Sequence, residues 1–108
     1  METPQNEPLD FRFSGELFEW TSNATSWFFI RLPTDQSAEL REQTDGLTSR
    51  FGSVRVEATI GAVVWKTSLF PSADPRTYIL PVKKAVRKAE EIEPGDEVDV
   101  SIRVLLVE

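Results

Sequence analysis

The densest group of chemically capable side chains in this sequence is basic and lies in one short run. Lys83, Lys84, Arg87 and Lys88 follow one another with no acid between them. On a helix they form like-charge pairs four residues apart, each of which costs about 0.2–0.5 kcal/mol unless a counter-charge relieves it. An anionic ligand would supply that charge, and so would neighbouring carboxylates. The run therefore predicts either an anion-binding helix or a solvated helix face.

A second group of polar side chains surrounds the extended segment 63–70. Lys66 and Ser68 belong to this segment, and Arg76 and Tyr78 could approach them across a sheet. Small barrels often bind ligands at such a mouth. The alternative is that Lys66 and Ser68 only keep an outer sheet face soluble. Together the two groups give one predicted ligand-binding set: Lys66, Ser68, Arg76, Tyr78, Lys83, Lys84, Arg87 and Lys88.

Aromatic residues form a third pattern. Trp20, Trp27, Phe29 and Arg31 could share one outward face, as in the platforms on which single-stranded nucleic acids stack their bases, and this gives an OB-like alternative. A pI near 4.7 and a net charge of −6 argue against it, because attraction to phosphates supplies most non-specific affinity. We therefore expect the rings to pack under the first helix and do not expect a nucleic-acid partner.

The sequence contains no histidine and no cysteine. Catalytic triads that need either residue are excluded, as are disulfides and zinc sites built from these ligands. An enzyme would have to use carboxylate or lysine chemistry, and no such pair is identifiable by spacing. We predict no cofactor, no metal site and no catalytic residue, and a binding function for a small anionic ligand or a protein partner.

The first half of the chain reads as a hairpin followed by a short helix. Residues 9–13 alternate between apolar and polar, the phase then slips beyond Gly15, and a bulge there would explain the slip. The dense apolar segment 27–32 forms the second strand and stops at Pro33. Thr34 or Asp35 can cap the helix that follows, and Gly46 is well placed to end it.

The second half contains the clearest hairpin and the basic helix. Segments 54–60 and 63–70 flank Gly61-Ala62, which suits a type II′ turn. After a short strand over 77–80, Pro81 suits the first position of a helix. The apolar stripe of that helix is Val82, Ala85, Val86 and Ala89, and Pro94-Gly95-Asp96 makes the turn into a terminal strand.

These elements predict a mainly β protein of one domain. We expect a small closed or partly open antiparallel β-barrel of six or seven strands, with one capping helix and a short second helix. Residues 1–8 are predicted to be a flexible tail and residues 9–108 the barrel, and no internal repeat is evident. The predicted inner face comprises Phe11, Phe13, Val54, Val56, Ile60, Val98, Val100, Ile102 and Val104.

Three segments in order, Phe28 to Pro33, Trp65 to Pro71 and Tyr78 to Ala89, followed by Gly95-Asp96, resemble a family of small bacterial domains of unknown function. The resemblance implies a helix-capped β-barrel, found alone or fused to a segment of the bacteriocin-resistance, OmpD-associated type. It implies no activity and no catalytic residue. Glu90-Glu91-Ile92 departs from the small residue or glycine that the family has after the helix.

The basic segment before Gly95-Asp96 is also similar to transcription factors of the AbrB type, which are shorter and close their barrel by dimerising. This chain has enough strands to close alone. The acidic N-terminal segment lacks the basic and apolar regions of a signal peptide, so a cytoplasmic location without membrane contact is expected. The protein is expected to be a monomer or a homodimer; the terminal strand, with apolar Leu105 and Val107, is one candidate contact.

Overall fold

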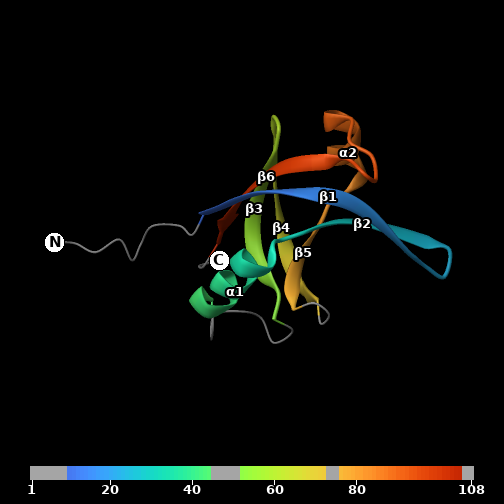
Figure 1. Ribbon diagram of the computed structural model, residues 1–108. Coiled ribbons are helices and arrows are strands. Elements are labelled where there is room, and N and C mark those ends of the chain that lie inside the picture. The colour runs from blue at the N-terminus through green and yellow to red at the C-terminus, as the bar shows by residue number, and fades with distance from the viewer. Residues whose placement is uncertain (1–9, 45–51, 73–75, 106–108) are drawn as a thin grey trace.

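A computed structural model describes residues 10–44, 52–72 and 76–105 (Figure 1). Within these residues, six strands close an antiparallel barrel in the order β1-β2-β5-β4-β3-β6. The predicted mainly β fold with two helices is therefore confirmed. The strands are β1 (Asp10–Ser22), β2 (Thr25–Arg31), β3 (Val54–Ile60), β4 (Val63–Ser72), β5 (Thr77–Pro81) and β6 (Glu97–Val104), and the helices are α1 (Thr34–Gln43) and α2 (Lys84–Glu90).

The interior of the barrel is filled by the apolar side chains that occupy every second position of the strands. Every residue of the predicted inner face is buried, from Phe11 in β1 to Val104 in β6. Leu17 extends this core along β1, and Ile30, Leu69 and Leu80 add to it from β2, β4 and β5. The predicted inner face is thus confirmed, because a shift of one residue in any strand would have exposed its apolar side chains.

The barrel consists of two similar halves, β1-β2-α1-β3 and β4-β5-α2-β6. β1 pairs with β2 and β6, and β4 pairs in the same way with β5 and β3. The halves join through β2–β5 and β3–β6. Two backbone hydrogen bonds of 2.9 Å occupy equivalent positions in the two halves, one from Leu32 N to Tyr78 O and the other from Val82 N to Phe28 O. The sequence shows no repeat, so this duplication is visible in the backbone alone.

β1 runs through Gly15 without a bulge, so the predicted bulge is wrong. Its pairing with β6 and its pairing with β2 each advance one residue at a time, and Leu17 continues the inward phase of Phe13. A Cβ at position 15 would lie 2.7 Å from Cγ2 of Ile30. Gly15 is therefore required by close packing on the inner face, and it interrupts the apolar pattern without shifting it.

The ends of β1 and β2 form a projecting arm, which extends to the right in Figure 1. β1 pairs with β6 only up to Glu16, and the ladder between β2 and β5 begins at Phe29. The turn residues Asn23 and Ala24 both have positive φ, which is the signature of a type I′ turn, so the predicted hairpin closes in a tight two-residue turn.

The expectation that the aromatic rings of this hairpin pack under the first helix is wrong for the two tryptophans. Trp20 and Trp27 face each other across the arm and are 54% and 50% exposed. Phe18 and Phe29 pair closer to the barrel, with ring centroids 5.9 Å apart. The guanidinium of Arg31 lies over Phe18. The outward-facing aromatic surface predicted from the sequence is therefore present, but its rings are distributed along the length of the arm.

Both helices begin differently from the prediction. Pro33 is the N-cap residue of α1 and no side chain caps this helix, so neither Thr34 nor Asp35 fills that role; Gly46 lies outside the described residues. Pro81 is the last residue of β5, because its fixed φ also suits a strand end, and α2 begins at Lys84 with Lys83 as N-cap.

The apolar stripe of α2 is narrower than predicted. Val82 and Val86 are buried, whereas Ala85 and Ala89 are exposed. α2 ends at Glu91 in the left-handed conformation, with Ile92 N donating to Arg87 O at 3.0 Å. Ile92 then packs against the core and takes the anchoring role expected of the alanines.

The two remaining turns agree with the sequence. Gly61 has φ of +59° between β3 and β4, and Asp96 N donates to Glu93 O across the turn before β6. No helix of the described residues is long and apolar enough to cross a membrane.

Candidate anion-binding pocket

A pocket of about 300 Å³ opens beside α2, where β4 separates from β5. β4 pairs with β5 only from Phe70 to Ser72, although β4 begins at Val63. Pro81 and the start of α2 turn away from the rest of β4 and leave the gap. We call this gap the α2 pocket; its lining residues are Ser26, Trp27, Phe28, Phe29, Trp65, Lys66, Thr67, Pro81, Val82, Lys83 and Arg87.

Three cations reach the α2 pocket from two elements. Lys83 and Arg87 lie one helical turn apart, on the side of α2 that is fixed by the burial of Val82 and Val86. Lys66 comes from the outer phase of β4 on the opposite wall. No acid lines the pocket. The three charges therefore meet without a neutralising partner in the lining.

Arg87 is held in place before any ligand arrives. Its guanidinium carbon lies 3.7 Å from the centroid of the Phe28 ring, a cation–π contact. Its Nε donates to Val82 O at 3.1 Å. Within the described part of the chain, neither Nη atom has a hydrogen-bond partner. Two donors in fixed geometry suit a carboxylate or phosphate oxygen pair.

Several nearby carboxylates lie outside the lining of the α2 pocket. Glu90 Oε2 accepts the Ala62 N–H at 3.2 Å, on the turn between β3 and β4. Glu91 and Glu93 border a neighbouring hollow together with Lys84, Arg87 and Lys88. Glu57 on β3 is the register partner of Lys66. Among the residues that the structure describes, Asp10 and Arg103 form the single ion pair, so no cation of the α2 pocket belongs to one.

The equivalent gap beside α1 is sealed, which sets the α2 pocket apart. Ser37 corresponds to Arg87, because Ser37 N donates to Pro33 O as Arg87 N donates to Lys83 O. Ser37 is fully buried and its Oγ accepts the Tyr78 N–H at 3.1 Å. Gln36 Nε2 donates to Arg12 O and ties α1 to β1. One half of the duplication is closed by small polar groups, and the other is left open and cationic.

The structure places the eight predicted ligand-binding residues in three regions. Lys66, Lys83 and Arg87 meet at the α2 pocket. Lys84 and Lys88 flank a shallower hollow, which Arg87 also borders. The remaining three lie apart: Ser68 is half-buried on the outer face of β4, Tyr78 is in the core, and Arg76 is exposed with its carbonyl accepting a hydrogen bond from Arg41.

The predicted approach of Lys66 and Ser68 to Tyr78 does not occur. The Tyr78 side chain points into the barrel, and its register partner on β4 is Pro71. Trp27, Phe28 and Trp65 line the pocket instead, although no local sequence pattern points to them. No periodicity could separate them from the core, because residues at a barrel mouth follow the same alternation as residues inside.

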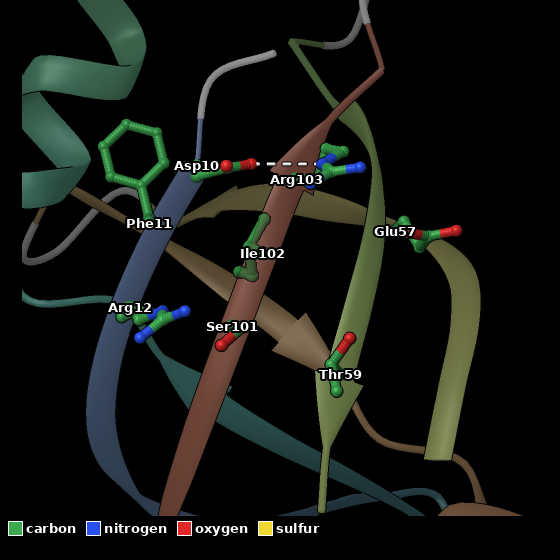
Figure 2. A pocket seen from close by; sticks show the side chains of 8 residues that line it. All are labelled: Asp10, Phe11, Arg12, Glu57, Thr59, Ser101, Ile102 and Arg103. Atoms are coloured by element: carbon green, nitrogen blue, oxygen red, sulfur yellow. Dashed lines mark hydrogen bonds and ion pairs between the residues drawn. The ribbon is translucent and has the colours of Figure 1, made fainter. Parts of the chain in front are cut away.

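Another hollow, of about 180 Å³, lies on the outer face of β1, β6 and β3 (Figure 2). Asp10 Oδ1 and Arg103 Nε are 3.2 Å apart at its rim, and both side chains are more than half exposed. Arg12 and Glu57 also line it, so acids and bases balance. The hollow lacks an uncompensated charge and is the weaker candidate. The described residues contain no cluster of three or more acidic, histidine or cysteine side chains that could hold a metal.

One comparison with known proteins identifies a relationship. A family model described as a domain of unknown function, DUF1905, matches residues 13–102. No curated protein sequence matches the chain.

Proposed function

This chain belongs to the DUF1905 family of domains of unknown function, and we propose that it is a binding module for a small anionic ligand held in the α2 pocket. The carrying observation is that Lys66, Lys83 and Arg87 line one pocket that contains no acid. In a chain with a net charge of −6, three cations on one small pocket are a local exception. An anion relieves their mutual repulsion, and the repulsion favours the ligand-bound state.

The fold supports this proposal through preorganisation. Arg87 is already stacked on Phe28 and bonded to Val82 O, so little side-chain freedom is lost when an anion binds. The pocket volume lies at the lower end of the range for small-molecule sites, about 300–1,000 Å³. A small carboxylate or phosphate ester is therefore the expected ligand class.

A thermal-shift screen of small carboxylates and phosphate esters at low salt tests the proposal, with calorimetry to measure affinity. A ligand present at about 100 times its Kd stabilises the native state by about 2.7 kcal/mol. Lys83→Gln should weaken binding about tenfold or more, because a charged hydrogen-bond donor contributes about 1.5–3 kcal/mol. Arg87→Gln should weaken it at least as much.

Lys84→Gln and Lys88→Gln are the matched controls, because they remove the same charge from the same helix outside the α2 pocket. Each should change affinity by less than about threefold through long-range charge alone. Equal weakening by the control and pocket variants would show that only net charge matters. The absence of binding by every anion at millimolar concentration would refute the module.

Contact with a second copy of the chain is the other candidate function, favoured by the arm. Residues 18–28 contain one charged side chain, Glu19, and carry both exposed tryptophans. The arm strands pair only with each other beyond the barrel ladders, so each leaves an open edge that a two-fold contact could pair. The terminal strand, which the sequence suggested as a contact between copies, is less available for one. Leu105 is half-buried and its N–H donates to Arg55 O, and Val107 lies outside the described residues.

Light scattering over a concentration series tests the arm contact. A dimer that Trp20→Ser dissociates would support it. A monomeric mass throughout, or a dimer unaffected by Trp20→Ser, would rule it out.

A further inference from the structure

We infer that the ligand of the α2 pocket carries a flat aromatic ring next to its anionic group; this inference rests on the anion site proposed above. Its basis is the rest of the lining. Trp27, Phe28 and Phe29 contribute from β2, and Trp65 contributes from β4. Four aromatic residues on two strands thus border a pocket whose charges are all positive, and the side chain of Phe28 lies on the opposite face of β2 from those of Trp27 and Phe29.

The rings lie where β4 and β2 flank the same gap. Phe28 and Trp65 pack against the core and extend it to the pocket mouth. Trp27, half exposed, stands at the rim. A flat ligand ring can stack on such surfaces and gains more than the area burial that a saturated ring of equal size would give.

The cations favour the same choice. A lysine ammonium or arginine guanidinium attracts the face of an aromatic ring, and a saturated ring offers no such face. Arg87 already makes this contact with Phe28, so Lys66 and Lys83 are the cations left for a ligand ring. Both the apolar and the charged parts of the lining therefore discriminate between flat and saturated ligands.

The chain contains its own control for the role of Trp27. Trp20 is its direct partner across the arm, with nearly the same exposure, but does not line the pocket. Trp27→Leu and Trp20→Leu therefore remove equal rings from one hairpin, and only the first removes a pocket wall. The Trp20→Leu protein also retains only the two pocket tryptophans, so its fluorescence reports on the pocket alone.

The experiment measures the affinities of phenyl phosphate, cyclohexyl phosphate, inorganic phosphate and benzyl alcohol by calorimetry, with tryptophan fluorescence as a second readout. Phenyl phosphate should bind the wild type and Trp20→Leu about tenfold more tightly than cyclohexyl phosphate does. Trp27→Leu should lose most of this preference, and Trp27→Phe should keep it. Circular dichroism and a thermal melt establish that each variant is folded, and Trp27→Phe decides the case if Trp27→Leu does not fold.

The outcomes separate this inference from the proposed function. Equal affinity for the phenyl and cyclohexyl esters would overturn the aromatic preference and leave the anion site standing, as would equal effects of Trp20→Leu and Trp27→Leu. Benzyl alcohol binding as tightly as phenyl phosphate would instead refute the anion site. Binding by none of the four probes would overturn both.

Discussion

The hydroxyl of Ser37 accepts the backbone N–H of Tyr78, and this contact links α1 to β5 inside the barrel wall. Both residues are buried. On the other half of the duplication, the position of Ser37 is taken by Arg87, whose guanidinium lies over the Phe28 ring. One exchange of a short side chain for a long cationic one thus accompanies the difference between a sealed gap and an open pocket.

Ser37→Ala should destabilise the protein by about 1–3 kcal/mol, because the buried Tyr78 N–H loses its acceptor. Thr44→Val is the control: its hydroxyl donates to Leu40 O, but that carbonyl also accepts the Thr44 N–H and stays satisfied. The control should cost less than about 1 kcal/mol. Urea unfolding measures both values, and equal costs would contradict the role of the Ser37 hydroxyl.

Gly15→Ala should cost about 1–3 kcal/mol, because the added methyl would lie 2.7 Å from Cγ2 of Ile30 and 3.2 Å from Arg31 O. The cost should be smaller in an Ile30→Ala background, where the first clash is absent. A double-mutant cycle by chemical denaturation gives the coupling. If the two changes add independently, close packing is not why the position is glycine.

Glu91→Gly should stabilise the protein by about 1 kcal/mol, because Glu91 has a left-handed φ of 55° that glycine adopts without strain. Lys88→Gly, inside the same helix, should lower stability by about 1 kcal/mol. Thermal and urea unfolding report both signs. A loss of stability in Glu91→Gly would mean that the glutamate side chain contributes more than the strain costs.

Glu97→Lys should stabilise the barrel by about 0.2–1 kcal/mol, since Glu97 lies directly opposite Glu16 across β1 and β6. The substitution replaces a like-charge pair with an opposite pair on an exposed face. The gain should shrink as salt is added. Unfolding curves at low and high ionic strength test this, and a gain that persists unchanged in high salt would exclude a charge effect.

Ile102→Ala should destabilise the protein by about 2–5 kcal/mol, because Ile102 is buried between β1 and β3 at the centre of β6. Arg103→Ala, at the next and exposed position, should have a much smaller effect. Denaturant unfolding compares the two. Similar values would mean that β6 is not held in this register.

Local sequence pattern is enough to assign the strands, their inward faces and two of the turns. Period-two alternation in segments such as 54–60 and 97–104 depends on each residue and its immediate neighbours, so it could be read without knowing the partners. It failed at Gly15, where a missing side chain imitated a change of phase. The helical pattern was misleading at Ala85 and Ala89. Small apolar residues tolerate exposure to water, and the width of an apolar stripe does not show how much of it is buried.

The α2 pocket, in contrast, depends on contacts between segments that are far apart in the chain. The duplication of the two halves depends on strand pairing across the chain, which composition does not encode. Lys66 meets Lys83 and Arg87 because β4 leaves β5 after three paired residues and α2 turns over the gap. Phe28 and Trp65 line the pocket for the same reason. Many residues of this chain follow the same apolar–polar alternation. Which of them lies at the pocket depends on how distant strands pair, and the local pattern carries no information about that pairing.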